Sequence, residues 1–509
     1  MKKKIFYVSA LAIGLFSIGS CKRELNVNPQ NRIPDNTFYK NGDDAFSALI
    51  SVYDRFGFQN GGLYDKLSIC DVAGDDQQTG GGSATDINDL QITEHYTLNS
   101  TTGPQTYLWT RGFSGIYRAN ILLSKLPGIP MDAGLKKRFA AECKAMRAAF
   151  YFDLVTFFES IPIIEGTLTI DSLYDVQQTT PDKVYAYAEK DLNEAIPDLP
   201  ITVPVATEGG RLTQGSAKAL LGKILLFEKK WQAAADQFAP VNGTTPGAAP
   251  SQYGYKLIAN YADLWKTANK FNTESVIEFV HSSKSNGNWN DAGASEGNLN
   301  CITSGPRSYS RVDTSAAPDF IGGYGFLIVA KDFAQNVMSS DPRYAASVIN
   351  MDSLRTAGKV KYDNSFNNSG YFLKKFIGLN PNKAQATPEL NFGQDEYEIR
   401  LADTYLMEAE ALLNAGAAVG AGSRALSLIN AVRARVGLAA LTAVTQDAIE
   451  KERRLELVGE GQRFLDLVRW GKAGAVLAFK GFKTGRNEVF PIPQAELDNT
   501  KLQQNAHWK

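Results

Sequence analysis

The chain has 509 residues, of which 44% are hydrophobic and 21% charged, so it can bury a substantial core. Its formal net charge of −1 gives no basic surface of the kind that binds nucleic acid, which excludes that class of partner. Three histidines and four cysteines, all widely spaced, disfavour a zinc site, a disulfide framework and His-based catalysis. We therefore predict no metal ion and no cofactor.

The first residues have the pattern of an export signal. Lys2, Lys3 and Lys4 precede an apolar run from about Ile5 to Phe16, and small residues follow up to Cys21. The run is shorter than the roughly 18 residues of a membrane-spanning helix, which indicates a signal peptide over 1–20. Without its three lysines, the mature chain has a formal charge of −4.

The sequence Ile18-Gly19-Ser20-Cys21 resembles a bacterial lipobox, in which the cysteine is lipidated and becomes the first mature residue. The alternative is an ordinary cleaved signal with an incidental cysteine. No later stretch has the length and apolarity of a transmembrane helix, so the lipid is the predicted membrane contact. Residues 21–40, with Pro29 and Pro34, are predicted to form a lipidated tether and strap.

Helical periodicity begins at Asn41, a predicted N-cap, and continues with an apolar face of Phe46, Leu49, Ile50 and Tyr53. Residues 57–108 follow, rich in Gly, Asp, Thr and Gln and without a long helix, which makes them a candidate functional loop. Further helices are predicted at about 109–126, 133–159, 180–197, 213–227, 231–238, 399–415 and 421–436.

Two of these helices have tetratricopeptide-like spacing. Leu221, Gly222, Ala234 and Phe238 fall where such a helix pair crosses closely. Residues 280–395 between the helical regions are irregular, with a predicted strand at 326–329 and a predicted helix near 330–339. The predicted fold is mainly α, a tetratricopeptide-like helix-pair scaffold with long irregular loop insertions and minor β structure.

Residues 445–471 form the densest charged pattern, with Glu456, Glu460, Arg463, Asp466 and Arg469 at helical spacing. Two interpretations are open. The glutamates are catalytic acids, or they belong to an Arg–carboxylate network that clamps two helices. We favour the network, because an arginine beside each acid keeps it ionised and thus unsuited to general acid catalysis.

These residues also resemble the C-terminal signature of the SusD/RagB family of outer-membrane nutrient-binding lipoproteins. Val489-Phe490-Pro491-Ile492-Pro493, with Glu496 and Asn499, is similar to that family's ending. Other blocks agree in order: Leu25 to Tyr53, Gly74 to Gly82, Trp109 to Asn120, Glu142 to Phe158, Arg211 to Leu226 and Arg400 to Gly416. One departure is Ala145-Met146, where Phe-Leu is commoner; methionine fills such a core site readily.

The resemblance implies a single helical domain over 41–509, with an N-terminal part of about 41–240 and a C-terminal part of about 270–509. It implies a non-catalytic protein on the cell surface, anchored to the outer membrane, that binds oligosaccharide or polysaccharide, or peptide in the RagB branch. It also implies a partner, a TonB-dependent, SusC-like transporter on which the protein sits as a lid.

Ligand candidates follow from sugar chemistry, because exposed aromatic rings stack on apolar C–H faces while polar side chains reach the hydroxyls. Four tryptophans lie in helical or framework blocks and are predicted to be core, and Trp508 is near the terminus. Trp289, flanked by Asn288 and Asn290, is the first candidate platform. Further candidates are Tyr309 with Arg307 and Arg311, Tyr324 between two glycines, Asp75, Asp76 and Gln78.

Interpretations without a ligand are also open for these residues. Trp289 is then an incidental loop aromatic, and the aspartates form Asx turns beside glycine. Asp75, Asp76 and Asp86 are alternatively Ca²⁺ ligands, although the EF-hand spacing is absent. A secreted glycoside hydrolase needs two carboxylates about 5–10 Å apart across a cleft, and no block resembles a glycosidase signature.

Overall fold

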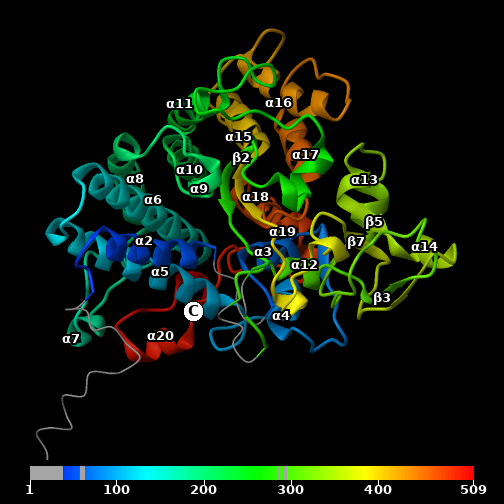
Figure 1. Ribbon diagram of the computed structural model, residues 1–509, viewed down its shortest axis with the longest axis horizontal. Coiled ribbons are helices and arrows are strands. Elements are labelled where there is room, and N and C mark those ends of the chain that lie inside the picture. Colours follow the sequence, from blue (N-terminus) through cyan, green and yellow to red (C-terminus); the bar gives the residue numbers. More distant parts are fainter. Residues whose placement is uncertain (1–37, 58–62, 285–286, 290–294) are drawn as a thin grey trace, which may run out of the picture.

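A computed structural model describes residues 38–57, 63–284, 287–289 and 295–509. The signal peptide, Cys21, most of the strap and Asn290 lie outside the described residues. Helices predominate in Figure 1, as the sequence predicts, and short strands gather at one side. In the described part of the chain, no helix has both the length and the apolarity needed to cross a membrane.

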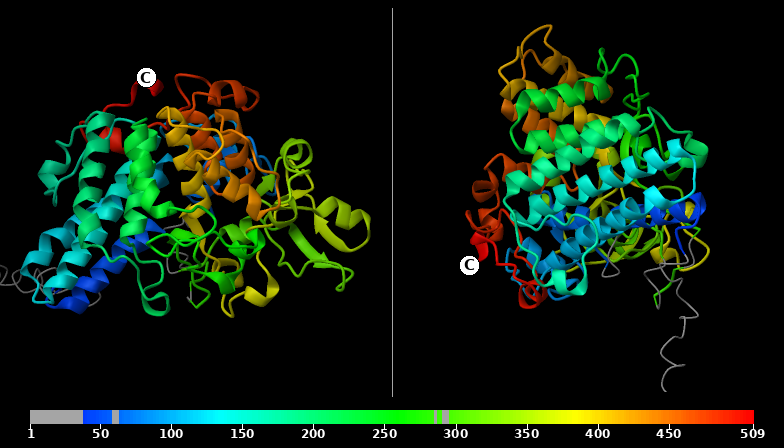
Figure 2. Two further views of the ribbon diagram at one scale, coloured as in Figure 1. Left: turned by 90° about the horizontal axis from the view of Figure 1, so that it is seen from above. Right: turned by 90° about the vertical axis from the view of Figure 1, so that its left-hand side faces the viewer.

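The N-terminal half is a layer of long helices that lie side by side (Figures 1 and 2). They are α2 (Gly42–Phe56), α5 (Gln105–Lys125), α6 (Ala133–Phe158) and α8 (Pro181–Ala195). Asn41 caps α2 as predicted, since its side chain accepts hydrogen bonds from the backbone N–H groups of Asp43 and Asp44. Helix α5 begins four residues before the predicted start, and α6 ends one residue before the predicted end.

The predicted apolar face of α2 is partly wrong. The helix buries Ala45, Ala48, Leu49, Val52 and Phe56, whereas Phe46 and Ile50 are 40% and 45% exposed. The two alanines carry the smallest apolar side chains on the helix, so turning them inward lets α2 approach α5 and α6 closely. The prediction from hydrophobicity alone assigned the larger residues Phe46 and Ile50 to the buried face, because it did not take the close approach of α2 to α5 and α6 into account.

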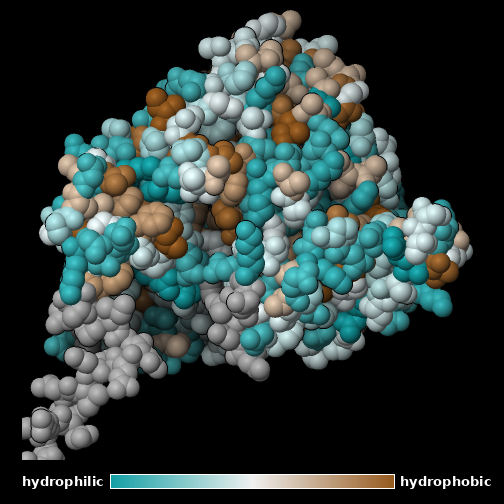
Figure 3. Space-filling model, viewed as in Figure 1, coloured by the Kyte–Doolittle hydropathy of each residue, from teal (hydrophilic) through white to brown (hydrophobic). Residues whose placement is uncertain are grey.

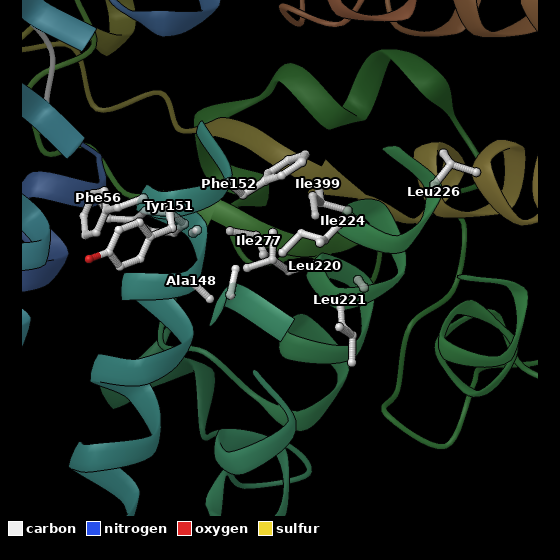
Figure 4. Packing of buried hydrophobic residues seen from close by; sticks show 14 of the residues in the cluster. Phe56, Ala148, Tyr151, Phe152, Leu220, Leu221, Ile224, Leu226, Ile277 and Ile399 are labelled. Carbon is white, nitrogen blue, oxygen red and sulfur yellow. The ribbon is translucent and has the colours of Figure 1, made fainter. Parts of the chain in front are cut away.

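Two tetratricopeptide-like helix pairs follow, α10 (Gln214–Phe227) with α11 (Trp231–Asn242), and α15 (Leu401–Asn414) with α16 (Arg424–Arg435). A Cβ atom on Gly222 would lie 2.7 Å from the ring of Phe238, so the close crossing predicted from the sequence is confirmed. Figure 4 shows Leu220 and Ile224 of α10 packed near Ile277 and Ile399, which belong to strands β2 (Ser275–Phe279) and β8 (Glu396–Arg400).

The loop regions contain only short elements. Between α2 and α5 the described residues hold only α3 (Lys66–Ala73), β1 (Gln77–Thr79) and α4 (Asn88–Glu94), so this stretch contains no long helix, as predicted. The remaining short helices are α7 (Ile170–Leu173), α9 (Val205–Glu208), α12 (Asn300–Thr303), α13 (Tyr344–Ser347), α14 (Met351–Thr356), α19 (Ala473–Val476) and α20 (Gln494–Asn499).

Three small antiparallel sheets join these loops. The largest has the order β1-β4-β7-β5, with β4 (Leu327–Val329), β7 (Tyr371–Leu373) and β5 (Val348–Asn350). The others pair β2 with β8, and β3 (Arg307–Arg311) with β6 (Val360–Asp363). Strand β4 confirms the predicted strand, whereas the helix predicted at 330–339 is only a π-helical turn over Phe333–Val337.

The charged C-terminal pattern forms a buried ion-pair network between α17 (Gln446–Glu456) and α18 (Arg463–Arg469) and the elements around them. The carboxylate of Glu456 is bound by Arg343 at 2.8 Å, by Arg400 at 2.6 Å and by Arg435. Glu460 binds Lys375 and Arg400 at 2.8 and 2.7 Å. The structural interpretation of these glutamates is confirmed.

We expect Gly222→Ala to lower the free energy of unfolding by about 1–3 kcal/mol, because the fully buried ring of Phe238 cannot yield to the added methyl group. Gly128→Ala is the matched control, since its Cβ meets nothing within 4 Å. Denaturant unfolding of both variants tests this; equal stabilities would contradict the close crossing.

Glu456→Gln should cost about 3–5 kcal/mol of stability, because it removes the negative charge that three buried guanidinium groups share. Burial alone would raise the pKa of Glu456, but Arg435, Arg400 and Arg343 hold it well below the usual 4.5. The contribution of ionised Glu456 to the free energy of unfolding is therefore fully present above pH 4.5 and is lost as the pH falls toward the lowered pKa.

The wild type should lose more stability than Glu456→Gln between about pH 5 and pH 3, which thermal unfolding across that range measures. Asp447→Asn is the control, since the side chain of Asp447 is 93% exposed. Parallel stability curves for the wild type and Glu456→Gln would show that the network does not hold Glu456 ionised.

Candidate ligand-binding surface

Three loops that are distant in the sequence meet at one exposed surface, which we call the aromatic surface: Trp289, Tyr324 with Arg307, and Gly80–Gly82. The rings of Trp289 and Tyr324 have centroids 6.5 Å apart and planes tilted by 48°. Trp289 is 50% exposed, and Tyr324 is intermediate between buried and exposed. Two adjacent, solvent-facing rings are therefore available to a flat apolar face of a ligand.

Tyr324 is fixed by its own backbone. Its N–H donates to the carbonyl of Ile302 at 2.8 Å, and its carbonyl accepts a 3.0 Å hydrogen bond from Nη1 of Arg307. The ring of Phe326, which is buried just before β4, has its centroid 5.4 Å from that of Tyr324 and packs against it. The position of Tyr324 is thus set before any ligand arrives.

The glycine loop after β1 lies directly against this segment. The N–H groups of Gly80 and Gly81 donate to the carbonyls of Phe326 and Gly325 at 2.8 and 2.7 Å. A Cβ on Gly80 would lie 2.1 Å from the carbonyl oxygen of Gly325, so only glycine fits there. This contact brings part of residues 57–108, the candidate functional loop, against the segment that carries Tyr324.

Charged groups frame the two rings. The guanidinium of Arg307 lies close to Gly82, since a Cβ atom on Gly82 would be 3.5 Å from its Nη2. Burial, and then the negative charge of Glu389, raise the pKa of the Tyr324 hydroxyl. The surface therefore combines two rings with a cation and a carboxylate. Sequence reasoning missed Glu389, because nothing in Thr387-Pro388-Glu389 marks a residue that folds back toward Tyr324.

Other predicted site residues have different positions. Asn288 is exposed beside Trp289, whereas Asn290 lies outside the described residues. Tyr309 is 8% exposed, and its hydroxyl donates to the carbonyl of Pro318 at 2.6 Å. The alternation of β3 turns Tyr309 inward against Phe320, so the structure does not bring its ring to the aromatic surface.

The predicted polar contacts Asp75 and Asp76 are engaged in ion pairs instead. Asp75 binds Arg463 and Arg454, both at 2.7 Å, and Asp76 binds Arg454 at 2.7 Å. These arginines oppose the effect of burial and lower the pKa of Asp75. Gln78 donates to the carbonyl of Asn367 at 2.6 Å.

Across the described ranges, no group of three or more His, Cys, Asp or Glu side chains is arranged to hold a metal ion. The Ca²⁺ alternative through Asp75, Asp76 and Asp86 thus has no geometric support. The oxygen Oδ2 of Asp86 instead accepts a 2.7 Å hydrogen bond from the N–H of Gly82.

All six tryptophans lie in the described residues, and Trp289 is the one that is exposed. Trp109 and Trp265 are 4% and 9% exposed, which confirms them as core residues. The indole of Trp470 donates to Glu410 at 2.8 Å. The aromatic surface therefore contains the most exposed of the six indoles.

Comparison with known proteins identifies the family. A solved structure described as a laminarin binding SusD-like protein is 44% identical and superposes with a TM-score of 0.87 over 92% of this chain and 100% of that chain. The chain belongs to the SusD-like family. The SusD family profile matches residues 328–488, and a profile described as "Starch-binding associating with outer membrane" matches residues 67–226.

More distant SusD-like relatives span the same length. A SusD-like protein of Formosa agariphila is 24% identical over 90% of this chain and 88% of its own. The surface glycan-binding protein A of Bacteroides thetaiotaomicron, solved in complex with laminarihexaose, shares the fold with a TM-score of 0.79 at 24% identity, over 92% of this chain and 100% of that chain. The SusD-like fold thus extends over nearly the whole described chain.

Proposed function

We propose that this SusD-like protein captures glycans at the aromatic surface, with laminarin as the first ligand to test. The observation that carries the proposal is the pair formed by the exposed ring of Trp289 and the half-buried ring of Tyr324, with centroids 6.5 Å apart. The 44% identical relative described as laminarin binding supports the choice of ligand. Glycan capture requires no covalent reaction, so the proposed role is non-catalytic.

The aromatic surface suits a neutral polyol. A sugar ring places its C–H face on the indole and phenol, while Arg307 and Glu389 offer a hydrogen-bond donor and an acceptor to its hydroxyls. Open, solvated stacking of this kind gives modest affinity, which suits capture followed by release.

The proposal also covers the cellular location and the partner of the protein, which are inferred from the sequence around Cys21 and from the family resemblance. Lipidation of Cys21 would tether the protein by residues 22–36 to the outer face of the outer membrane, and a TonB-dependent, SusC-like transporter would receive the captured glycan. Stable anchoring needs more than one acyl chain, which lipoprotein processing supplies. The profile associated with the outer membrane supports this placement.

Trp289→Ala should weaken laminarin binding about tenfold or more, a loss of about 1.4 kcal/mol, because it removes the most exposed platform. Affinity electrophoresis in laminarin gels and calorimetry with laminarihexaose measure this. The melting temperature should change little, since half of the side chain is already exposed.

Asp75→Asn is the matched control for that experiment. It should lower the melting temperature by weakening the pairs with Arg454 and Arg463, while leaving laminarin affinity unchanged. Unchanged retardation of Trp289→Ala would remove Trp289 from the site. Binding of peptides but not of laminarin or starch would favour the RagB-like alternative, and release of reducing sugar would refute a non-catalytic role.

Cys21→Ala should release the protein from the membrane fraction while preserving laminarin binding, because the proposed lipid is attached at Cys21 and the residues assigned to the aromatic surface are others. Fractionation of cells that lack the partner transporter, followed by immunoblotting, provides the test. Retention of the variant in the membrane fraction of such cells would show that the anchor is not at Cys21.

A further inference from the structure

The two rings of the aromatic surface need fixed positions to act together. Figure 3 shows a face that is largely hydrophilic, with hydrophobic residues in small, separate groups. A sugar that contacts only a few rings gains affinity when those rings are already in place, because ordering mobile side chains costs free energy. Tyr324 is held by its backbone hydrogen bonds, whereas Trp289 is 50% exposed, so its position depends on what holds its loop.

The loop that carries Trp289 is closed at its base, which we call the neck, by Gly287 on one side and by Ser295 and Gly297 on the other. A Cβ atom on Gly287 would lie 2.5 Å from the backbone of Ser295, so the two sides meet closely at a glycine. A Cβ atom on Gly297 would lie 2.2 Å from the carbonyl oxygen of Leu390. The neck therefore packs directly against the chain at Leu390.

One buried side chain joins the two sides of this neck. Asn391 is 0% exposed. Its Nδ2 donates to three carbonyls, those of Gly287, Ala386 and Thr387, at 3.0, 3.0 and 3.1 Å. Its Oδ1 accepts a 3.3 Å hydrogen bond from the hydroxyl of Ser295. Because a buried amide is stable only when its hydrogen bonds are made, Asn391 holds both sides of the neck at once.

The same side chain supports an unfavourable turn. Thr387 has a φ of 37°, in the left-handed region that β-branched residues rarely adopt. The hydrogen bonds from Asn391 to the carbonyls of Ala386 and Thr387 hold the chain in this turn. Since the turn leads directly into Glu389, one carboxamide sets the path of two segments of the aromatic surface.

A chain of hydrogen bonds continues from Asn391 toward Tyr324. The next residue, Phe392, is 1% exposed, and its carbonyl accepts a 2.8 Å hydrogen bond from the N–H of Asn298. The Oδ1 of Asn298 accepts from the N–H of Asn300 at 2.8 Å, at the start of α12. Helix α12 also carries the carbonyl that binds the N–H of Tyr324. The backbones that carry the two rings therefore belong to one hydrogen-bonded framework.

We propose that Asn391 is a positioning residue for glycan binding: its carboxamide fixes the neck and so holds Trp289 at the distance and tilt from Tyr324 that a sugar needs. Asn391 is fully buried, so it acts only through the residues that it holds. This inference rests on the proposed glycan capture at the aromatic surface.

The first test observes Trp289 without any ligand. In the full chain labelled with 5-fluorotryptophan, the ¹⁹F resonance of Trp289 is identified by its loss in Trp289→Phe. Asn391→Ala should shift or broaden that resonance by more than its line width and leave the other five tryptophan resonances in place. An unchanged Trp289 resonance in folded Asn391→Ala would overturn the proposal.

Asn242→Ala is the matched control. Asn242 is 1% exposed, and its Nδ2 donates to the carbonyl of Thr404 at 3.0 Å and to Glu408 at 2.7 Å, between α11 and α15. Both variants should lower the melting temperature, because each leaves buried polar groups unpaired. Only Asn391→Ala should move the Trp289 resonance; equal movement in both variants would indicate a general loss of structure and contradict a positioning role.

If Asn391→Ala does not fold, Ser295→Ala replaces it. This variant removes the hydroxyl that donates to the carbonyl of Leu390 and to Asn391, and it leaves the carboxamide in place. Ser295 is only partly buried, so the variant should keep the wild-type melting temperature within a few degrees. The Trp289 resonance should still move, and an unmoved resonance would again overturn the proposal.

Laminarin affinity tests the functional consequence. Asn391→Ala should weaken laminarin binding at least fivefold in calorimetry. The same change in a Trp289→Ala background should weaken the remaining binding less than twofold, because the two residues act through one contact. Equal losses in both backgrounds would show that Asn391 does not act through Trp289. Failure of the wild type to bind laminarin would refute the proposed function alone, since the ¹⁹F resonance is measured without ligand.

Discussion

The fold depends on the burial of Glu456. Its side chain is fully buried, and that is tolerable only because Arg343, Arg400 and Arg435 reach it from three different parts of the chain. Each of those arginines is itself nearly excluded from water, so none can leave without stranding a charge. The network therefore specifies how β8, α16, α17 and the segment before α13 meet, and not merely that they pack.

That network extends to the ligand-binding loops through its outer members. Arg454 on α17 and Arg463 on α18 hold Asp75, and the chain from Asp75 runs directly through β1 into the glycine loop. The loop is thus fixed at one end by ion pairs and at the other by hydrogen bonds from Gly80 and Gly81 to the segment that carries Tyr324. Asp75 anchors the start of this strand, whereas Tyr324 is held separately by its own hydrogen bonds to Ile302 and Arg307.

Local sequence signals predicted what depends on local interactions. Periodicity and caps gave the helices to within a few residues, because a helix closes its own hydrogen bonds, and the density of Arg and Glu at 445–471 indicated an ion-pair network. Long-range partners were not predictable in this way. The pairing of Asp75 with Arg454 and the electrostatic effect of Glu389 on Tyr324 join residues tens to hundreds of positions apart.

Trp289 and Tyr324 illustrate why a candidate platform must be judged by what holds it. An exposed ring contributes to affinity only if little conformational freedom is lost when the ligand arrives. Tyr324 meets that condition through its hydrogen bonds to Ile302 and Arg307 and its contact with Phe326. The rings of Phe56 and Phe279 are also fixed, but Phe150 and Lys66 already lie against them. An aromatic ring is therefore a candidate platform only where its position is fixed and its face is open to solvent.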